Sequence, residues 1–514
     1  MTLNKNRKLI LTILVGVAVT APAQAWAGGF LGGLFEVWGP RYTYAGDAED
    51  QMRWSQPPPP ICGNTANSVR RWNHVALDAD AIDHTPPAPG ESRVFGEQLG
   101  PARTSRAFAI IHIAIFEAVN AIAGGFQSYT GLAPAGPETS MEAAVAQAAH
   151  DTLAAMFPSQ TPRFDALLAE DLSVIPDGAA KDNGIYVGQQ AAAGILALRA
   201  DDGSDQPEPR IGIEFFTSNQ PGKWRQDPIS QNPLALGAYW GAVRPFVLSS
   251  ATQFRASAPP SLTSVAYTLA YNEVKTVGGD GMTTPAVRTP DQTFAGIYWA
   301  YDGTPGLGTP PRLYNQIAVQ IAGQMDSDVV QLARLLALVN VALADSAIAC
   351  WETKYYFQFW RPITAIRESD PGTGPTGAGD GNLLTVGDPN YTPLGAPASN
   401  LRGPNFTPPF PAYTSGHATF GGAFFETLRY FYGTDNIAFT FVSDEFNGMT
   451  SDNQGNVRPR LARRFSSLSQ AEEENGQSRI YLGIHWAFDK TEGLSQGRKV
   501  ADYVLGNAFV PKSY

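Results

Sequence analysis

One long apolar segment, from Ser327 to about Trp360, limits the possible folds of this chain more than any other feature. Aliphatic side chains recur in it at helical spacing and form a single packing stripe: Leu332, Leu335, Leu336, Val339 and Leu343. The segment therefore predicts a long core helix. Trp351 and Lys354 follow near its C-terminal end, so an aromatic and a cationic side chain are expected close together at that end of the helix.

Most of the remaining chain also has helical patterning, with few strand-like alternations. The predicted helices span residues 68–81, 105–123, 139–156, 161–174, 178–199, 262–276, 290–301, 310–324, 418–432, from 468 into the last motif described below, and 493–505. Residues 200–260 are rich in Pro, Gly, Ser and Asn and predict a long connection, residues 363–412 predict a loop, and residues 443–460 an irregular stretch. We expect an all-α protein with an N-terminal arm and helical half at 28–230 and a C-terminal helical half at 231–514.

The N-terminus has the pattern of a signal peptide over residues 1–27. Three basic residues precede an apolar stretch, Leu9 to Thr20, that is short for a membrane span, and cleavage is expected after Ala25 or Ala27. The alternative is an N-terminal membrane anchor. No later run of about 18 uninterrupted apolar residues is present, so we expect a soluble protein, secreted or periplasmic, with no membrane association after cleavage.

Composition narrows the function further. The chain has 514 residues, 43% hydrophobic residues and a net charge of −11, which favours a large core and argues against nucleic-acid binding. The two cysteines, Cys62 and Cys350, do not form a disulfide scaffold. They either pair with each other or leave Cys350 as a buried free thiol, and the sequence leaves both open.

Ser415-Gly416-His417 stands where the Gly/Pro-rich loop ends and an apolar helix begins. The first N–H groups of a helix have no intrahelical partner, and the helix dipole is positive there, so this junction attracts an oxyanion. His417 adds a group that titrates near neutral pH. The alternative is a capped helix with a surface histidine. The histidines outside the motifs have no ligand-like spacing and are expected to be structural or at the surface: His74, His84, His112 and His150.

Two further motifs supply cations and a second histidine. Lys354 and Arg361 are two helical turns apart, which predicts one shared helix face and a separation of roughly 10 Å along the axis. Downstream, Arg479 precedes His485, and Asp489 lies four residues after that histidine. At this spacing the Asp489 carboxylate can hold one imidazole nitrogen of His485 and leave the other free.

Lys-x6-Arg-Pro, then Ser-Gly-His, then Ser-Arg-x5-His-x3-Asp, in this order, resembles the signature of vanadium-dependent haloperoxidases and the type 2 phosphatidic acid phosphatase superfamily. Thr414 stands where the family usually has Pro, which removes no ligand. The segments around Tyr298–Gly303 and Pro310–Gln316 resemble the haloperoxidases more than the phosphatases. The resemblance implies two four-helix bundles, with the cofactor site in the C-terminal one.

The resemblance also implies a role for each motif residue. Vanadate oxygens would accept hydrogen bonds from Lys354, Arg361, Arg479, Ser415 and the Gly416 N–H. His485 would bind vanadium through one ring nitrogen, and His417 would deprotonate the incoming peroxide. Vanadate would then act as a Lewis acid, with Lys354 polarising the bound peroxide, so that no haem, flavin or NAD is needed.

Three assignments follow from the resemblance at the edge of the site. Asp291 would be a supporting carboxylate that orients an active-site arginine. Trp351 and Phe410 would line a halide pocket of the chloroperoxidase type, with bromide also oxidised, whereas algal bromoperoxidases carry Arg and His at these places. Aromatic walls exclude water and strengthen the field on a hydrated chloride. The alternative is that both aromatic residues are ordinary core packing.

The expected function is oxidation of chloride or bromide by hydrogen peroxide to hypohalous acid, with an organic molecule as the halide acceptor. The alternative on the same residues is a secreted acid phosphatase, in which His485 would form a phosphohistidine and His417 would be the acid for the leaving group. A non-catalytic helical anion-binding protein is a third interpretation. The sequence does not decide whether the chain forms a homo-oligomer.

Overall fold

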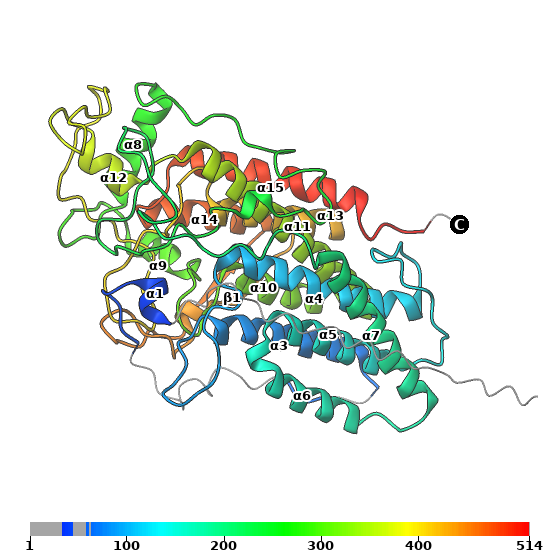
Figure 1. The fold of residues 1–514 in the computed structure, drawn as a ribbon. Helices are drawn as coiled ribbons and strands as arrows, with labels where there is room; N and C mark the ends of the chain where they lie inside the picture. The colour runs from blue at the N-terminus through cyan, green and yellow to red at the C-terminus, as the bar shows by residue number, and fades with distance from the viewer. Residues whose placement is uncertain (1–32, 45–57, 61–62, 513–514) are drawn as a thin grey trace, which may run out of the picture.

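The structure is a computed structural model that describes residues 33–44, 58–60 and 63–512. These residues are mostly helical, as predicted (Figure 1). The N-terminal helices are α1 (Leu34–Trp38), α3 (Thr65–Asp83), α4 (Gly100–Ala123), α5 (Met141–Met156), α6 (Thr161–Ser173) and α7 (Ala179–Arg199). The C-terminal helices are α8 (Val265–Val277), α9 (Pro290–Tyr298), α10 (Pro310–Gln324), α11 (Val329–Phe357), α12 (Pro362–Glu368), α13 (Gly416–Tyr432), α14 (Leu468–Tyr481) and α15 (Ala487–Asn507).

Helix α11, the predicted long core helix, lies between the two halves of the molecule. It packs against α4 on one side and against α13 and α15 on the other. Figure 1 shows α3, α5, α6 and α7 on one side of this layer and α13, α14 and α15 on the other. A helix that is apolar all round is buried all round. The two halves therefore share one core, and the predicted division near residue 230 remains a prediction.

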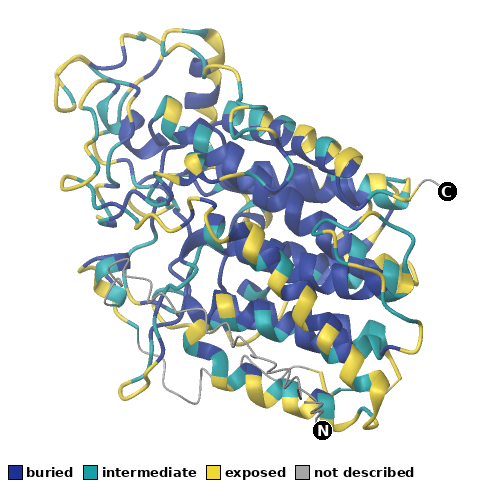
Figure 2. Ribbon diagram, turned by 45° about the vertical axis from the view of Figure 1, so that its right-hand side comes forward, coloured by how far each residue is buried: buried dark blue, intermediate teal, exposed yellow. Residues whose placement is uncertain are grey.

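Helices α4 and α11 are long and apolar enough to cross a membrane by length and composition. In the structure, 89% of the apolar window of α4 and 94% of that of α11 are buried inside the fold. Figure 2 shows the same pattern, with the buried surface gathered on the central helices and the exposed surface on the outer ones. Their apolar character is explained by burial in the protein core.

Close backbone contact joins α13 to α15, the two helices that carry the histidine motifs. A Cβ atom built on Gly497 of α15 would lie 2.0 Å from the carbonyl oxygen of Thr419, and one built on Gly422 of α13 would lie 2.5 Å from that of Leu494. Only glycine permits this approach. The pairing of glycine with the facing backbone sets the distance between the two motifs.

The long predicted connection at residues 200–260 is irregular, as expected, apart from a single 3₁₀ turn at Trp240–Ala242. It is held to α11 by Asp345, a fully buried carboxylate that accepts the backbone N–H groups of Phe246, Val247 and Leu248 at 2.6, 2.8 and 2.9 Å. Burial raises the pKa of Asp345. One charged side chain thereby satisfies three consecutive donors of a loop.

Two local predictions are wrong. Residues 362–368 form helix α12 rather than loop, because Pro362 occupies the first helical turn, where its missing N–H is not needed. Helix α15 begins at Ala487, not near residue 493, and continues through Gly506. The predicted irregular stretch at 443–460 is confirmed apart from one 3₁₀ turn at Asp444–Phe446. A short antiparallel pair of strands flanks it, β1 (Phe439–Val442) and β2 (Ala462–Phe465), with Phe439 opposite Phe465.

The predicted signal peptide lies outside the described residues, as does Cys62. Cys350 is a free, buried thiol with its Sγ 3.5 Å from the hydroxyl oxygen of Thr414. The free-thiol alternative is thus confirmed for Cys350.

Candidate active site

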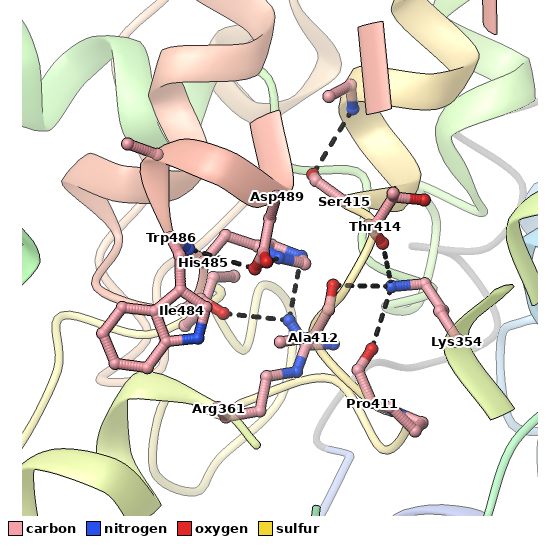
Figure 3. Close-up of polar contacts among 12 residues, drawn as sticks. Lys354, Arg361, Pro411, Ala412, Thr414, Ser415, Ile484, His485, Trp486 and Asp489 are labelled. Atoms are coloured by element: carbon pink, nitrogen blue, oxygen red, sulfur yellow. Dashed lines mark hydrogen bonds and ion pairs between the residues drawn. The ribbon is translucent and has the colours of Figure 1, made fainter. Parts of the chain in front are cut away.

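Four segments of the C-terminal half bring the predicted site residues together. Lys354 comes from the last turn of α11, Arg361 from the start of α12, Ser415 to His417 from the start of α13, and Arg479 to Asp489 from the end of α14 and the start of α15. Figure 3 shows Lys354, Arg361, His485 and Asp489 pointing toward one another around the loop that leads into α13. The three motifs therefore form one site.

Lys354 and Arg361 do not share a helix face, so that prediction is wrong. Helix α11 ends at Phe357, and Gln358 adopts a left-handed conformation with φ of 50°. The chain then turns, and Arg361 becomes the N-cap residue of α12. The two side chains still reach the same site, because a turn between α11 and α12 takes the place of the single continuous helix that was predicted.

Lys354 is fully buried and holds the loop before α13. Its Nζ donates to the carbonyl oxygens of Pro411 at 2.9 Å and Ala412 at 3.0 Å, and also to that of Thr414. Burial lowers the pKa of Lys354 to about 7. The Lys354 amino group therefore fixes the loop by its carbonyl groups, and in its protonated form it places a positive charge beside the start of α13.

Arg361 ties the same loop to the third motif. Its Nε donates to the carbonyl oxygen of Phe410 at 3.0 Å, and one terminal nitrogen donates to the carbonyl oxygen of Ile484 at 2.9 Å and contacts His485 Nε2 at 2.8 Å. Burial lowers the pKa of Arg361 to about 9. Because a guanidinium can only donate, the contact requires that His485 Nε2 carries a lone pair.

The other ring nitrogen of His485, Nδ1, lies 2.8 Å from an Oδ2 of Asp489, as the spacing predicted. The same oxygen accepts the Trp486 N–H at 3.0 Å. Burial, reinforced by Arg361 and Lys354, holds the pKa of His485 well below its ordinary value, and burial raises the pKa of Asp489 to about 7. His485 is thus a neutral imidazole with Nδ1–H directed at Asp489. Its Nε2 lone pair accepts from Arg361 in this structure, and it can serve as a metal ligand once that hydrogen bond is given up.

Ser415 caps α13, and its Oγ accepts the Ala418 N–H at 3.4 Å. His417 is buried in the first turn, and its Nε2 lies 2.6 Å from the carbonyl oxygen of Ala300. Since a carbonyl only accepts, Nε2 carries the proton and Nδ1 the lone pair. Burial, together with Arg479, holds the pKa of His417 well below its ordinary value, so the ring is a neutral base.

Asp291 is not the carboxylate that orients an active-site arginine, so this assignment is wrong. It lies at the surface and pairs with Arg463 at 2.8 Å. Asp302 has that role instead, with its two oxygens 2.7 and 2.9 Å from one terminal nitrogen of Arg479. Burial raises the pKa of Asp302. The sequence held a signal for Asp302, because it lies within the haloperoxidase-like segment Tyr298–Gly303.

Trp351 and Phe410 lie against each other, with ring centroids 5.0 Å apart. The Nζ atom of Lys354 lies 5.7 Å from the Trp351 ring and 5.0 Å from the Phe410 ring. The Trp351 Nε1–H donates to the carbonyl oxygen of Leu236 at 3.1 Å. Both rings belong to the main hydrophobic core and also line the cavity described next, so packing and pocket lining occur together.

A cavity of about 60 Å³ opens onto the site. Its walls include Trp351, Phe410, Gly416, His417, Arg479 and His485, as well as Asp302. His84, expected to be structural or at the surface, also lines it, although its ring is satisfied by the Gly100 N–H at 2.9 Å and by the carbonyl oxygen of Asp80 at 2.9 Å. Lys354 and Arg361 lie behind this wall, held by loop carbonyls.

The residues present fit an oxyanion such as vanadate. Two guanidinium nitrogens of Arg479, Nε and one terminal nitrogen, are buried without a hydrogen-bond partner in the described part of the chain. Buried cationic donors of this kind require an anion. Among the described residues, no group of three His, Cys, Asp or Glu side chains suits a bare metal cation. The site therefore offers positive charge, a helix N-terminus and the imidazole lone pairs of His417 Nδ1 and His485 Nε2.

Comparison with known proteins identifies relatives of this chain. The family model described as the VCPO second helical-bundle domain matches residues 334–509. A vanadium chloroperoxidase of Curvularia inaequalis is 31% identical over 507 aligned residues, which cover 82% of this chain and 79% of that protein.

Solved structures share the fold. The first bacterial vanadium-dependent iodoperoxidase matches with a TM-score of 0.67 and 24% identity, over 86% of this chain and 97% of that one. A holo-type bacterial vanadium-dependent chloroperoxidase matches with a TM-score of 0.58 and 15% identity, over 79% of this chain and 92% of that one. Taken with the sequence identity to the chloroperoxidase and the joining of all three motifs in one buried site, this likeness confirms the predicted family: the chain belongs to the vanadium-dependent haloperoxidases.

Proposed function

We propose that this protein uses vanadate to oxidise chloride and bromide with hydrogen peroxide, forming hypohalous acid. The observation that carries the proposal is the pair of unpartnered Arg479 nitrogens in a cavity that also exposes His417 and His485. An oxyanion in this cavity would satisfy those donors, and His485 Nε2 would supply the bond to the metal. When bound, vanadate supplies a Lewis-acid centre that activates peroxide.

The positively charged side chains that would surround this cofactor are already held in place by other groups of the protein. Arg479 is fixed by Asp302, Arg361 by three backbone carbonyls, and Lys354 by three more. The Gly416 N–H at the start of α13 and the Ser415 hydroxyl would add neutral donors. Arg479 has unpartnered donors, whereas Lys354 and Arg361 donate to carbonyl groups and supply positive charge beside the cavity. Charges that are already in place need no rearrangement at the moment of reaction, which is the main source of electrostatic stabilisation in such sites.

His417 would be the proton acceptor for incoming peroxide. Its Nε2–H is held by the Ala300 carbonyl, so Nδ1 has the free lone pair and the ring has a fixed orientation. Because burial and Arg479 depress the pKa of His417, the ring is neutral at ordinary pH and ready to accept a proton.

Chloride is the halide that the aromatic pair favours. Trp351 and Phe410 form an apolar wall within 6 Å of the Lys354 ammonium, which lowers the local dielectric around a small anion. We also propose that the protein is secreted or periplasmic, on the pattern of residues 1–27 in the sequence. Peroxide, halide and an organic acceptor would be its reaction partners.

Reconstitution tests the proposal. Protein freed of vanadate should gain halide-dependent halogenation when vanadate and peroxide are added, and phosphate should compete with vanadate. His485→Ala should abolish tight vanadate binding in equilibrium dialysis, whereas the matched control His150→Ala, at a partly buried histidine outside the site that is paired with Asp151 and Asp165, should not. No halogenation across a range of pH, with hydrolysis of a phosphate ester in the absence of vanadate, would instead establish the phosphatase alternative.

A further inference from the structure

The short segment from Ala300 to Asp302, between α9 and α10, contacts two of the residues that the proposed reaction needs. The Ala300 carbonyl oxygen accepts the Nε2–H of His417 at 2.6 Å, which leaves the lone pair of that ring on Nδ1. Two positions later, the Asp302 oxygens lie 2.7 and 2.9 Å from one terminal nitrogen of Arg479. The orientation of the proton acceptor and that of the anion-binding guanidinium therefore depend on the same segment.

Tyr301, the residue between these two contacts, has an unfavourable backbone conformation. Its φ is 47°, in the left-handed region, which is rare for a bulky side chain. This angle sets the rotation between the peptide group that carries the Ala300 carbonyl and the residue that carries the Asp302 carboxylate. With a right-handed φ at Tyr301, one of the two groups would turn away from the site. Such a conformation persists only where the surrounding structure holds it, and such residues are concentrated at functional sites.

The Tyr301 side chain is held in place at its hydroxyl group, and its ring is fully buried in the main hydrophobic core. The hydroxyl donates to Gln316 Oε1 of α10 at 3.1 Å and accepts the N–H of Asp444 at 2.7 Å. Gln316 Nε2 donates to the Asp444 carboxylate at 2.9 Å, so the three residues form a closed ring of hydrogen bonds. Burial, together with the Asp444 carboxylate, holds the pKa of Tyr301 well above its ordinary value, so the hydroxyl keeps the proton that it donates.

We propose that Tyr301 is a positioning residue for halide oxidation. Its hydroxyl group, held between α10 and the turn at Asp444, keeps the Ala300 carbonyl on His417. Through the same anchor it keeps the Asp302 carboxylate on Arg479. The inference rests on the proposed haloperoxidase function, and Tyr301 itself does not line the cavity. Without the anchor, the segment can relax toward an ordinary φ, and both contacts loosen together.

Calorimetry with inorganic phosphate and folded, vanadate-free protein tests the Arg479 contact without any need for turnover. Tyr301→Phe keeps the ring and removes the hydroxyl, so the Kd for phosphate should rise about two- to tenfold, the effect of one neutral hydrogen bond. Tyr298→Phe is the matched control, because Tyr298 is also fully buried and donates to the Phe441 carbonyl at 3.0 Å. If Tyr301 only stabilises the fold, Tyr301→Phe will lower the urea midpoint and leave the Kd for phosphate at the wild-type value, which would overturn the proposal.

Gln316→Met tests the same anchor from α10. Gln316 is only partly buried, so this variant is expected to fold even if Tyr301→Phe does not. It removes the acceptor of the Tyr301 hydroxyl and should also weaken phosphate binding about two- to tenfold. Gln320→Met, one turn later on α10 and bonded to the Thr440 carbonyl, should not weaken it. In the double variant of Tyr301 and Gln316 the two effects should not multiply, because both break one ring of hydrogen bonds. Fully multiplicative effects, or equal affinities of Gln316→Met and Gln320→Met, would refute the anchor.

Turnover of the vanadate-loaded enzyme tests the His417 contact. Tyr301→Phe should lower kcat/KM for peroxide about tenfold, because a proton acceptor that is out of position acts less efficiently. The same loss in Tyr298→Phe, or no loss in Tyr301→Phe, would contradict the positioning role. A wild-type protein that binds phosphate but halogenates nothing would contradict the proposed function instead, and the phosphate affinities would still decide whether Tyr301 positions Arg479.

Discussion

Replacing Lys354 by Met should change how the stability of the vanadate-free protein depends on pH. Lys354 is fully buried, and burial lowers its pKa to about 7, whereas an unfolded chain retains the lysine proton up to about pH 10.4. Between these values the unfolded state binds more protons than the folded state. Raising the pH therefore stabilises the folded wild type through this group, and methionine removes the effect.

The magnitude follows from that difference in proton binding. One proton corresponds to about 1.36 kcal/mol per pH unit, so the stability of wild type minus that of Lys354→Met should rise by about 2 kcal/mol between pH 7.5 and pH 9. Taking this difference removes the contributions of titrating groups that do not interact with Lys354, which are shared by both proteins; Asp489, whose pKa Lys354 lowers, is not among them. Following how this difference changes with pH, rather than its value at one pH, removes the pH-independent effect of leaving the Pro411 and Ala412 carbonyls without their donor.

Equilibrium urea unfolding at four pH values from 7.5 to 9 measures this difference. Lys499→Met, at an exposed position of α15, is the control and should run parallel to wild type. A flat difference between wild type and Lys354→Met would refute the reasoning. It would mean that the three carbonyl acceptors around Nζ keep the ammonium group charged in the folded protein as strongly as water does in the unfolded one.

Three further predictions concern single contacts. Asp302→Asn should destabilise the vanadate-free protein by about 3–5 kcal/mol in urea unfolding, because Arg479 would keep a buried charge without its counter-ion, and an unchanged midpoint would contradict this. Asp345→Ala should lower stability by about 3 kcal/mol through three unpaired N–H groups, while vanadate affinity measured by dialysis stays within about twofold of wild type; a large loss of affinity would contradict the anchoring role. Phe410→His should reduce chloride-dependent halogenation more than bromide-dependent halogenation at mildly acidic pH, and an equal loss would count against a halide-selecting role.

Contacts between near neighbours in the chain were predicted well. The pairing of His485 with Asp489 follows from a separation of four residues, although it forms at the start of α15 and not inside a helix, since α15 begins at Ala487. Likewise, Ser415 was placed correctly at a helix N-terminus, because the change from a Gly/Pro-rich loop to an apolar helix is local. Local geometry depends on few dihedral angles, so the sequence is informative at this range.

Contacts between distant segments were not predictable in the same way. The carboxylate that pairs with Arg479 of α14 is Asp302, on the loop after α9, and not Asp291. The two aspartates are only eleven positions apart in the sequence, so the sequence did not distinguish them. Which one faces the site depends on how α9 packs against α14. Lys354 and Arg361 converge across the end of α11 because Gln358 adopts a left-handed conformation. Glutamine rarely adopts positive φ, so the sequence did not predict this turn.

The sequence alone determined the chemistry that this protein can hold: three cations, two histidines and a helix N-terminus in three motifs, with the helical segments that carry them. Only the tertiary structure decided how these groups are oriented. It assigned the ring proton to His485 Nδ1 and to His417 Nε2, left two Arg479 nitrogens unpaired, and gave Tyr301 its left-handed conformation. Residue type sets which interactions are possible, whereas burial and the packing of distant segments decide which of them are satisfied within the protein and which are left for a ligand.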